Sequence, residues 1–486
     1  MPGYMRSNII GQGFVIGGLK RRNNNIMSII ENIPSSFRDP SGNLFYYNGT
    51  LYRKIHYSYK ENYDHLVSSG LYEVLCSNKY LIEHKEVVPD ELPLTDIYKI
   101  IKPDIIEFVS YPYEWCFSQL KHAALLTLNI QKIALNYGMS LKDCSAYNVQ
   151  FKNGKPIFID TLSFEKYEEG KPWVAYRQFC QHFLGPLSLM SFKDVRLGQL
   201  LRIYIDGIPL DLASSLLPYR TLLKVGMLMH IHLHARSQKR FENKTIQKEK
   251  YKMSRSSFVA LVDNLESSVN RLNWEPKGTE WSDYYEFSNY SGIAIKHKEK
   301  VIGEIFDKFD PGVVWDLGAN DGFFSRLIAN KAKNVVSFDI DPACVEKNYL
   351  NCIKNGETRI LPILMDLTNP SACIGWQNKE RFSLFDRANA DTVIALALIH
   401  HLAISNNIPF DSVADFFQKI CRFLVVEFIP KSDSQVKKLL SVRADVFSNY
   451  SLTMFENGFK NYFAVLESVK IEDSGRILFL MKRIRD

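Results

Sequence analysis

Short apolar runs alternate with segments of helical length along the second half of the chain. The runs occupy residues 313–317, 335–338, 360–365, 392–399 and 423–429. Strands buried on both faces read as continuous apolar runs, and their alternation with helices is typical of a parallel sheet covered on both sides. Two further runs, at residues 462–469 and 476–482, predict a closing pair of strands. The pattern therefore predicts an α/β domain over residues 291–486.

The first half of the chain carries a less regular mixture of strand and helix signals. Two β-rich runs, 45–47 and 50–55, are joined by Asn48-Gly49, which is a strong signal for a hairpin. Apolar residues at helical spacing predict helices over residues 62–79, where Gly70 weakens the helix, and over residues 113–137. We expect three segments before the α/β domain: a flexible tail (1–35), an α+β domain (36–250) and a helical linker (251–290).

Composition narrows the classes of protein to which the chain can belong. Of the 486 residues, 46% are hydrophobic and 23% are charged, as in an ordinary globular protein. The eight cysteines include no C-x-x-C pair, which argues against a disulfide scaffold or a zinc ribbon and favours the cytoplasm. No apolar run approaches the ~18 residues that a transmembrane helix needs. A net charge of +7 is small for this length and disfavours a nucleic-acid partner.

Polar residues gather where the apolar runs of the second half end. The first run leads into Asp316 and then into a turn bracketed by Gly318 and Gly322, which would bring backbone N–H groups close to a ligand. The second run ends at Asp339, at a spacing from Asp316 that suits a carboxylate binding a ribose. The later runs lead to further polar residues: Asp366, His400, His401 and Glu427. The carboxyl ends of parallel strands meet at one edge of a sheet, so we expect the ligand there.

These residues make the second half similar to a class I S-adenosylmethionine-dependent methyltransferase, a family with a Rossmann-like, seven-stranded sheet. Residues 316–322 (D-L-G-A-N-D-G) resemble its first motif, residues 338–341 its second, and residues 365–367 the site of its adenine-binding acid. The resemblance implies S-adenosylmethionine as cofactor, with Asp339 on the ribose hydroxyls and Asp366 on the adenine amino group. It further implies cofactor contacts for six other residues: Asp316, Gly318, Asn320, Gly322, Ile340 and Leu367. Asn320 stands where the family more often has glycine.

Two reactions are compatible with the polar residues at the strand ends: methyl transfer and a dinucleotide-dependent oxidation or reduction. Transfer to a hydroxyl or amine needs alignment and a base, for which we expect His400, His401 or Glu427, with packing or helix capping as the alternative for the histidines. The rival is a dinucleotide-dependent oxidoreductase. Its turn follows G-x-G-x-x-G and cradles a pyrophosphate, which Asp316 would repel. The charge of the turn therefore favours a cationic methyl donor.

The stretch 141–160 of the first half resembles the catalytic loop and metal-binding Asp of the protein-kinase and aminoglycoside-kinase fold. The resemblance implies that Asp143 orients a hydroxyl, while Asn148 and Asp160 hold Mg²⁺ on ATP. Lys54 would bind phosphate and Glu73 would pair with it. The stretch departs from the pattern, with Leu141 in place of the family's His, Asp160-Thr161-Leu162 in place of Asp-Phe-Gly, and no glycine-rich loop. Turn capping by these side chains is the structural alternative.

Taken whole, the chain resembles bacterial fusions of a kinase-like region with a class I methyltransferase, some linked with nodulation or surface-polysaccharide synthesis. The resemblance implies an acceptor that is a glycan, a lipid-linked sugar or a small metabolite. Two alternatives stay open for the first half. It could be a kinase in a bifunctional enzyme, or a pseudokinase scaffold that presents the substrate.

Overall fold

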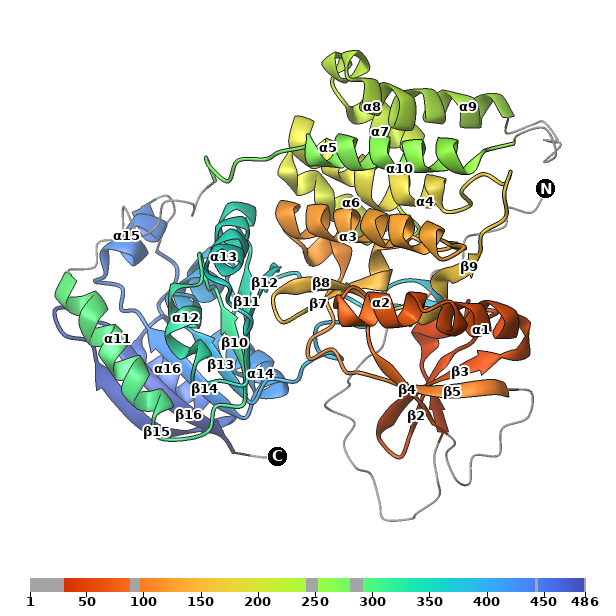
Figure 1. Cartoon of the computed structure of the whole chain (residues 1–486). Helices are drawn as coiled ribbons and strands as arrows, with labels where there is room; N and C mark the ends of the chain where they lie inside the picture. The colour runs from red at the N-terminus through yellow and green to blue at the C-terminus, as the bar shows by residue number, and fades with distance from the viewer. Residues whose placement is uncertain (1–29, 88–96, 242–251, 280–291, 442–444, 485–486) are drawn as a thin grey trace. The chain divides into compact units, whose positions relative to one another are not determined.

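The structure is a computed structural model that describes residues 30–87, 97–241, 252–279, 292–441 and 445–484 (Figure 1). Most of the predicted tail (1–29) and part of the predicted linker (280–290) lie outside the described residues. The chain divides into two units. The first holds Arg21–Glu275 and Cys373–Arg381, and the second holds Pro276–Ala372 and Phe382–Asp486. Among the described helices, none combines the length and the apolar character that a bilayer crossing requires.

The first unit contains the hairpin that the sequence predicts. Strands β2 (Leu44–Tyr47) and β3 (Thr50–His56) pair antiparallel, with Tyr47 opposite Thr50. Asn48 and Gly49 between them have φ of 49° and 74°, as a two-residue turn of this kind requires. The five-stranded antiparallel sheet has the order β1-β2-β3-β5-β4, where the other strands are β1 (Ile30–Asn32), β4 (His84–Val87) and β5 (Ile97–Pro103).

Two sequence expectations differ from the structure in this region. Residues 30–35, assigned to the tail, form β1 and a turn in which Ile33 is buried; a three-residue strand is too short to show alternation. The helix expected over residues 62–79 is two helices, α1 (Lys60–Ser68) and α2 (Leu71–Ser77). Gly70 separates them with a φ of 84°, a left-handed conformation that ends a helix.

Two small two-stranded sheets and a set of helices follow the five-stranded sheet of the first unit. Strand β6 (Met139–Leu141) pairs with β9 (Phe164–Lys166), and β7 (Val149–Lys152) pairs with β8 (Lys155–Phe158). The long helix expected over residues 113–137 is α3 (Phe117–Asn136). The other helices are α4 (Tyr176–Phe179), α5 (Gly185–Phe192), α6 (Leu200–Ile203), α7 (Leu210–Leu216), α8 (Val225–Met227), α9 (His234–Phe241) and α10 (Arg255–Asn270).

Helix α10 lies in the predicted linker but packs on the first unit. Its Asp263 and Glu266 both form ion pairs with Lys132 of α3, at 2.6 and 2.7 Å. At its carboxyl end, Lys121 Nζ of α3 donates to the carbonyl oxygens of Asn270 and Leu272. The first unit accordingly continues through this helix.

The second unit contains the seven-stranded sheet that the sequence and the resemblance predict. Its order is β12-β11-β10-β13-β14-β16-β15, in which the first five strands are parallel and β16 runs antiparallel to both of its neighbours, β14 and β15. The strands are β10 (Val313–Leu317), β11 (Asn334–Asp339), β12 (Ile360–Leu364), β13 (Thr392–Ala395), β14 (Phe423–Phe428), β15 (Phe463–Lys470) and β16 (Ile477–Arg483). The helices are α11 (Gly292–Phe306), α12 (Phe323–Ala329), α13 (Pro342–Asn355), α14 (Phe410–Ile420), α15 (Ser434–Ser441) and α16 (Leu452–Phe459).

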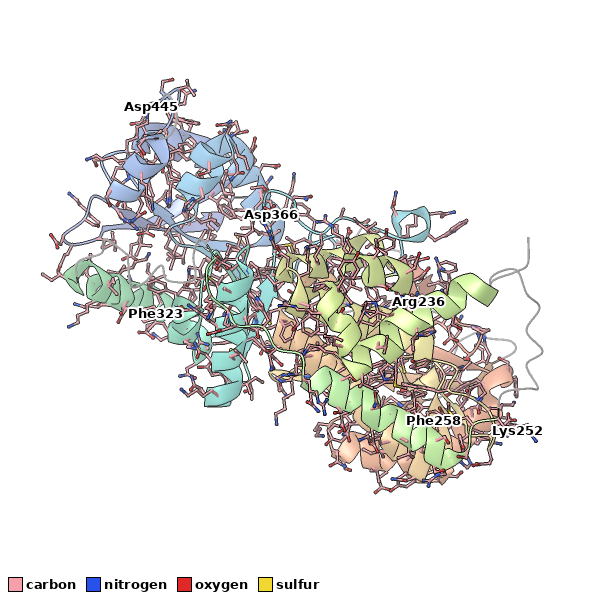
Figure 2. All side chains as sticks on the ribbon, turned by 90° about the horizontal axis from the view of Figure 1, so that it is seen from above. Arg236, Lys252, Phe258, Phe323, Asp366 and Asp445 are labelled. Atoms are coloured by element: carbon pink, nitrogen blue, oxygen red, sulfur yellow. The ribbon has the colours of Figure 1, made fainter. Side chains whose placement is uncertain are left out.

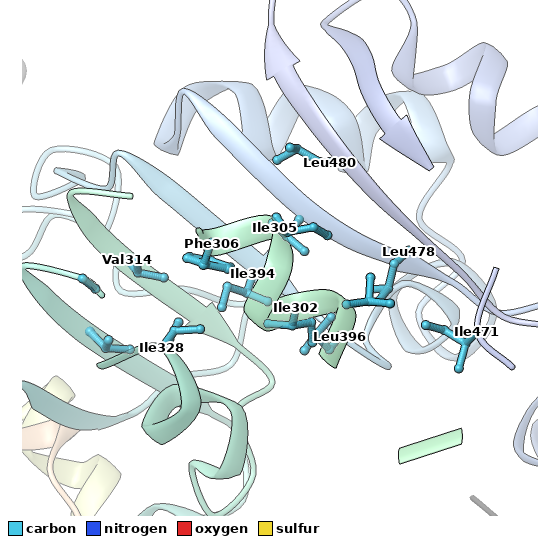
Figure 3. Packing of buried hydrophobic residues seen from close by; sticks show 14 of the residues in the cluster. Ile302, Ile305, Phe306, Val314, Ile328, Ile394, Leu396, Ile471, Leu478 and Leu480 are labelled. Carbon is cyan, nitrogen blue, oxygen red and sulfur yellow. The ribbon is translucent and has the colours of Figure 1, made fainter. Parts of the chain in front are cut away.

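The central strand β10 is covered on both faces, since all five of its residues are buried. Val314 faces a hydrophobic cluster in which Ile302 and Ile305 of α11 pack on the sheet, together with Leu478 of β16 (Figure 3). Trp315, the next residue along, points to the opposite face and packs on Phe338 with ring centroids 4.9 Å apart. Burial on both faces explains why β10 reads as an unbroken apolar run, and it leaves the strand's carboxyl end as the place for polar residues.

Candidate functional site

The turn after β10 has a backbone that glycine makes possible. Gly318 and Gly322 have φ of 77° and 83°, and Gly322 precedes α12 directly. A Cβ at Gly322 would lie 2.3 Å from Oδ1 of Asn348, whereas one at Gly318 would lie 3.4 Å from the Leu398 side chain. Gly322 therefore serves both the turn and the close approach of α13. The N–H of Gly318 donates to the carbonyl oxygen of Phe338, which ties the turn to the end of β11.

The predicted ribose-binding carboxylate, Asp339, lies beside this turn. Its Oδ2 accepts from the N–H of Asn320 at 2.7 Å, and its Oδ1 accepts from the N–H of Asp341 at 2.8 Å. Asn320 adopts a φ of 52°, which asparagine tolerates better than most residues. Ile340, the next residue after Asp339, is 56% exposed, an apolar side chain open to a ligand. The structure thus brings Asp339, Asn320 and Ile340 to one strand edge.

The predicted adenine-binding carboxylate lies at the adjacent strand end. The N–H of Met365 donates to the carbonyl oxygen of Asp339, so the segment after β12 adjoins the end of β11. Asp366 Oδ1 accepts from the N–H and the hydroxyl of Thr368, at 2.8 and 2.6 Å. Asp366 and Leu367 are both half-buried, and Figure 2 labels Asp366 together with Phe323, the first residue of α12. The three predicted carboxylates, Asp316, Asp339 and Asp366, therefore lie at or just after the ends of three adjacent strands.

Burial raises the pKa values of Asp316 and Asp339, the two carboxylates nearest the turn. Asp316 is 2% exposed, and its Oδ2 accepts from the hydroxyl of Ser325 at 2.6 Å. Burial raises the pKa of Asp316 to about 6, although Ser325 and the charge of Lys298 oppose the shift. Burial likewise raises the pKa of Asp339 to about 6 against the two N–H groups that it accepts from. Both carboxylates are ionised at neutral pH, and a cationic ligand would stabilise that form.

His400 and His401, two of the three predicted catalytic residues, lie together after β13. Their ring centroids are 4.1 Å apart. Burial lowers the pKa of His400 well below its usual value and the pKa of His401 to about 4, so both rings are neutral at pH 7. His400 is 2% exposed and its Nδ1 is buried without a hydrogen-bond partner. A neutral ring with an unsatisfied nitrogen can accept or donate one proton.

The third predicted catalytic residue, Glu427, lies inside a buried ionic network. Its Oε2 accepts from Lys298 Nζ of α11 at 2.7 Å and from the N–H of Ala397 at 2.8 Å. Its Oε1 lies 3.7 Å from Arg476 NH1. Burial would raise the pKa of Glu427, but the charges of Lys298 and Arg476 outweigh burial and lower it. The lowered pKa favours the ionised carboxylate, which holds the backbone N–H of Ala397 in the segment between β13 and His400.

Sequence reasoning missed Lys298 and Arg476, although one signal was present for Lys298. It lies on α11 at helical spacing from Ala294, Val301 and Ile302, all of which are buried, so it shares the apolar face of the helix. Its side chain is 3% exposed. A lysine on the buried face of an amphipathic helix points to a buried anionic partner. No comparable pattern marks Arg476, which precedes β16.

In the first unit, Asp143, Asn148 and Asp160 lie in one connected cluster. Asn148 Nδ2 donates to the hydroxyl of Ser163 at 3.1 Å, and that hydroxyl donates to Asp160. Asp143 Oδ1 accepts from the N–H of Ser145 and from Gln178 Nε2. Burial, followed by the charge of Asp160, raises the pKa of Asp143 to about 7. The three predicted polar residues are thus brought together and buried.

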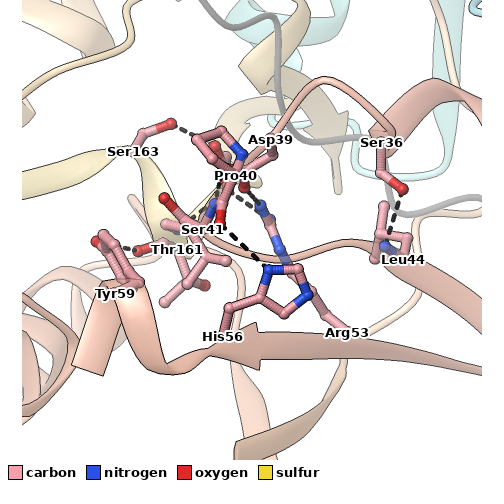
Figure 4. Close-up of polar contacts among 12 residues, drawn as sticks. Ser36, Asp39, Pro40, Ser41, Leu44, Arg53, His56, Tyr59, Thr161 and Ser163 are labelled. Atoms are coloured by element: carbon pink, nitrogen blue, oxygen red, sulfur yellow. Dashed lines mark hydrogen bonds and ion pairs between the residues drawn. The ribbon is translucent and has the colours of Figure 1, made fainter. Parts of the chain in front are cut away.

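The guanidinium of Arg53, a residue of β3, lies in this cluster. Arg53 forms ion pairs with Asp160 and with Asp39, the latter at 2.8 Å (Figure 4). Its side chain is 4% exposed, and both carboxylate side chains are fully buried. The segment around Asp39 runs along β3, because the N–H of His56 donates to the carbonyl oxygen of Ser41 at 2.9 Å. Arg53 and Asp39 are functional candidates that sequence reasoning missed.

The structure does not bring Lys54 or Glu73 to the cluster. Lys54 is the neighbour of Arg53 on a strand with alternating burial, so it points to the other face and lies 4.9 Å from the Phe45 ring centroid. Glu73 is exposed on α2. Alternation could have identified Arg53, since it shares its face with Leu51 and Ile55.

Comparisons with known proteins give one relative of nearly full length. No family model matches the chain. Nodulation protein NoeA of Rhizobium meliloti (strain 1021) is 30% identical over 459 residues, which cover 93% of this chain and 96% of that protein.

Solved structures match about two fifths of the chain. Magnesium protoporphyrin IX methyltransferase from Synechocystis PCC 6803, with bound SAH, is 16% identical over 42% of this chain and 92% of its own, with a TM-score of 0.30. The N-methyltransferase NodS from Bradyrhizobium japonicum WM9 is 11% identical over 40% of this chain and 99% of its own, also with a TM-score of 0.30. The full-length match carries the assignment, and the chain therefore belongs to the family of nodulation protein NoeA.

Proposed function

We propose that the second unit is an S-adenosylmethionine-dependent methyltransferase that acts on a glycan, a lipid-linked sugar or a small metabolite. One observation carries the proposal: the N–H groups of Asn320 and Asp341 hold the carboxylate of Asp339 beside a glycine turn, next to the exposed Ile340. Each oxygen of Asp339 accepts one N–H and keeps a lone pair for a ribose hydroxyl. The relative is a nodulation protein, and we extend that biological setting to this chain.

The residues present fit the proposed cofactor. A cationic sulfonium suits a site with two ionised carboxylates, Asp316 and Asp339, in a region where burial strengthens attraction. Gly318 and Gly322 would border the methionine part, Ile340 and Leu367 the adenine ring, and Asp366 the adenine amino group. When bound, S-adenosylmethionine supplies an electrophilic methyl group for in-line displacement.

The residues after β13 and β14 would serve the acceptor. His400 is neutral, so it can take the proton of a hydroxyl or amine as the acceptor attacks. His401, whose ring lies against that of His400 at a tilt of 41°, is the alternative base. We assign Glu427 a positioning role instead of a catalytic one, because its bonds to Lys298 and Ala397 hold the segment that leads into His400.

Titration calorimetry tests the proposed cofactor site. We expect the wild-type protein to bind S-adenosylmethionine, and Asp339→Ala to weaken binding at least about tenfold by removing a charged hydrogen-bond acceptor. Asp307→Ala is the matched control, since Asp307 is an exposed carboxylate of the same unit that pairs with Lys331. No binding to wild type, or equal binding to Asp339→Ala, would reject the proposal. Mass spectrometry of glycans and metabolites from cells with and without the gene would identify the acceptor.

A second proposal concerns the first unit, which we infer to be a kinase-like scaffold that does not bind Mg-ATP. The supporting observation is the ion pair of Arg53 with Asp160, one of the two predicted Mg²⁺ ligands. A guanidinium there supplies the positive charge that a metal ion would otherwise supply, and the second carboxylate, Asp39, satisfies it further. The bifunctional alternative requires Arg53 to leave two buried carboxylates, which is costly.

A further inference from the structure

A cavity of about 440 Å³ opens in the second unit between two segments that follow β13 and β14 in the chain. One wall is the segment 403–411, which follows β13, and the other is the segment 446–458, which includes most of α16. The ring of Tyr450 lies on Phe428, the last residue of β14, and the Tyr450 hydroxyl donates to the carbonyl oxygen of Ile429 at 2.7 Å. The cavity is therefore built onto the carboxyl end of β14, directly after Glu427.

The position of the cavity relates it to the proposed cofactor residues. Asp339 and Asp366 follow β11 and β12, which lie on one side of β10 in the sheet order, whereas β13 and β14 lie on the other side. The carboxyl ends of all five parallel strands share one edge, and the order reverses at β10. In this strand order β13 lies between β10 and β14. His400, which follows β13, is therefore placed between the turn after β10 and the cavity near the end of β14. A molecule in the cavity is thus on the side of the sheet where the candidate bases lie.

The walls are largely apolar and aromatic. The apolar lining residues include Ile408, Phe410, Val446, Phe447, Tyr450 and Met454. Phe410 and Tyr450 pack with ring centroids 5.3 Å apart, and Phe410 also meets Phe455 edge-on at 5.5 Å, so this part of the lining is held by a ring cluster. Cavities of a few hundred Å³ with such walls are typical of small-molecule sites.

The polar residues that line the cavity are neutral or negatively charged. It consists of three amides and one carboxylate: Asn407, Asn449, Asn457 and Asp411. No lysine or arginine is among the lining residues that the structure describes. Lys460 donates to Oδ1 of Asn457 at 2.7 Å but does not itself line the cavity. Amides bind hydroxyl and amide groups, while a carboxylate accepts from hydroxyls and repels anions.

We propose that this cavity binds the methyl acceptor, and that the acceptor is an uncharged molecule with an apolar part and hydroxyl or amide groups. The inference rests on the proposed methyltransferase function and narrows its substrate. Among the lining residues that the structure describes, a phosphate or diphosphate would lose its hydration without gaining a cationic partner, next to Asp411. The described lining therefore favours an acceptor that places no phosphate or diphosphate in the cavity, which disfavours nucleotide-linked sugars, lipid diphosphates and nucleic acids.

The test compares two probes of equal chain length, octyl β-glucoside and octyl phosphate, each below its micellar concentration. Binding to the full chain is followed by saturation-transfer NMR and calorimetry. Met454→Trp fills the cavity, and Thr453→Trp is the matched control, because Thr453 is the exposed neighbour on α16 that does not line it. We expect the glucoside to bind wild type and Thr453→Trp equally, Met454→Trp to bind it about tenfold or more weakly, and the phosphate to bind more weakly than the glucoside.

Three outcomes would overturn the proposal: no binding of the glucoside, equal binding of the phosphate, or undiminished binding by Met454→Trp. Titration with S-adenosylmethionine separates this failure from failure of the proposed function. Met454→Trp is expected to bind S-adenosylmethionine like wild type, because Met454 lies on α16 and the cavity lining includes none of the residues assigned to the cofactor. A chain that binds the glucoside as expected but no S-adenosylmethionine would refute the methyltransferase and retain the neutral-ligand site.

Discussion

At the scale of single residues, the second unit depends on charges that water does not reach. Lys298 and Glu427 are 3% and 0% exposed at their side chains, and Arg476 is 6% exposed. Arg476 also bonds Asp433 through its Nε at 2.8 Å, so two cations face two carboxylates. Such a network is stable only while it is complete, because removing one partner leaves a buried charge unpaired. The network lies where the backbone turns toward His400. We infer that the cost of burying these charges is offset by the position that the network gives to His400.

Glu427→Gln is expected to destabilise the protein by roughly 3–5 kcal/mol, because it leaves Lys298 buried without a counter-charge. Urea unfolding at pH 7 measures the change. Glu467→Gln is the control, since Glu467 forms a similar ion pair with Lys308 on an exposed part of β15 and is expected to stay within about 1 kcal/mol of wild type. Equal effects of the two substitutions would contradict the role of the buried network.

The binding of S-adenosylmethionine is expected to weaken as pH falls through 6. Burial raises the pKa of Asp316 and of Asp339 to about 6, and only the ionised carboxylates attract a cation and accept from ribose hydroxyls. Calorimetry at pH 5 and 7 should therefore show an affinity about tenfold lower at pH 5 for each carboxylate that must be ionised. Asp339→Asn removes one of the two titrations, so its pH dependence should be shallower. A pH-independent affinity would count against this site.

The folding stability of the unliganded protein should change with pH in the direction opposite to that of S-adenosylmethionine binding. Both aspartates have folded-state pKa values above their usual value of 3.8, so the folded protein holds protons that the unfolded chain has lost. Their contribution to stability is present at low pH and is lost as pH rises through about 6. Asp143 of the first unit, whose pKa burial raises to about 7, should add a loss of the same sign, so urea unfolding of Asp339→Asn against wild type isolates the contribution of Asp339.

At the scale of elements, the turn between β10 and α12 combines two constraints at Gly322. Its φ of 83° disfavours any side chain, and a Cβ would lie 2.3 Å from Asn348 of α13. Gly356, at the end of α13, has a φ of 66° but no atom within 4 Å of a Cβ. A substitution at Gly356 therefore tests backbone strain alone, whereas one at Gly322 tests backbone strain together with steric overlap.

Gly322→Ala is expected to cost more than Gly356→Ala. The second substitution should cost about 1 kcal/mol through backbone strain alone. The first should add roughly 1–3 kcal/mol for overpacking and should also weaken S-adenosylmethionine binding, because the turn must shift. Thermal unfolding and calorimetry measure the two effects. Equal costs for both variants would show that Asn348 moves away freely.

At the scale of the whole molecule, each unit has a buried core of its own. The second unit packs α11 on its sheet, and the first packs Tyr59 and Tyr63 on Ile55 and Leu162. The buried charge cluster around Arg53 belongs to the first unit, and the glycine turn belongs to the second. A ligand specific to one site should therefore stabilise the unit that holds it.

Scanning calorimetry of the full chain tests this division. We expect S-adenosylmethionine to raise the melting temperature of the transition that Gly322→Ala lowers, and Mg-ATP to raise none. Mg-ATP binding that Asp160→Ala abolishes would refute the scaffold proposal and favour the bifunctional enzyme. Asp104→Ala is the control, because Asp104 is an exposed carboxylate of the same unit.

The amino-acid sequence alone determined the features that depend on local spacing. The Asn48-Gly49 hairpin, the alternation of apolar runs and helices, and the seven strands of the second unit follow from periodicity and turn chemistry, and the structure confirms them. The acids at the ends of β11 and β12 could be expected together because parallel strands share an edge. The division of α1 from α2 was within reach, since a glycine such as Gly70 weakens a helix wherever it interrupts one.

Tertiary structure decided which side chains meet across the chain. Arg53 and Asp160 are 107 residues apart, and Lys298 and Glu427 are 129 residues apart, so no local pattern pairs them. The same holds for the cavity, whose two walls come from segments separated by α14 and β14. Local spacing specifies helices, strands and faces, but the partner of a buried charge depends on which faces the fold brings into contact, and that is a property of packing.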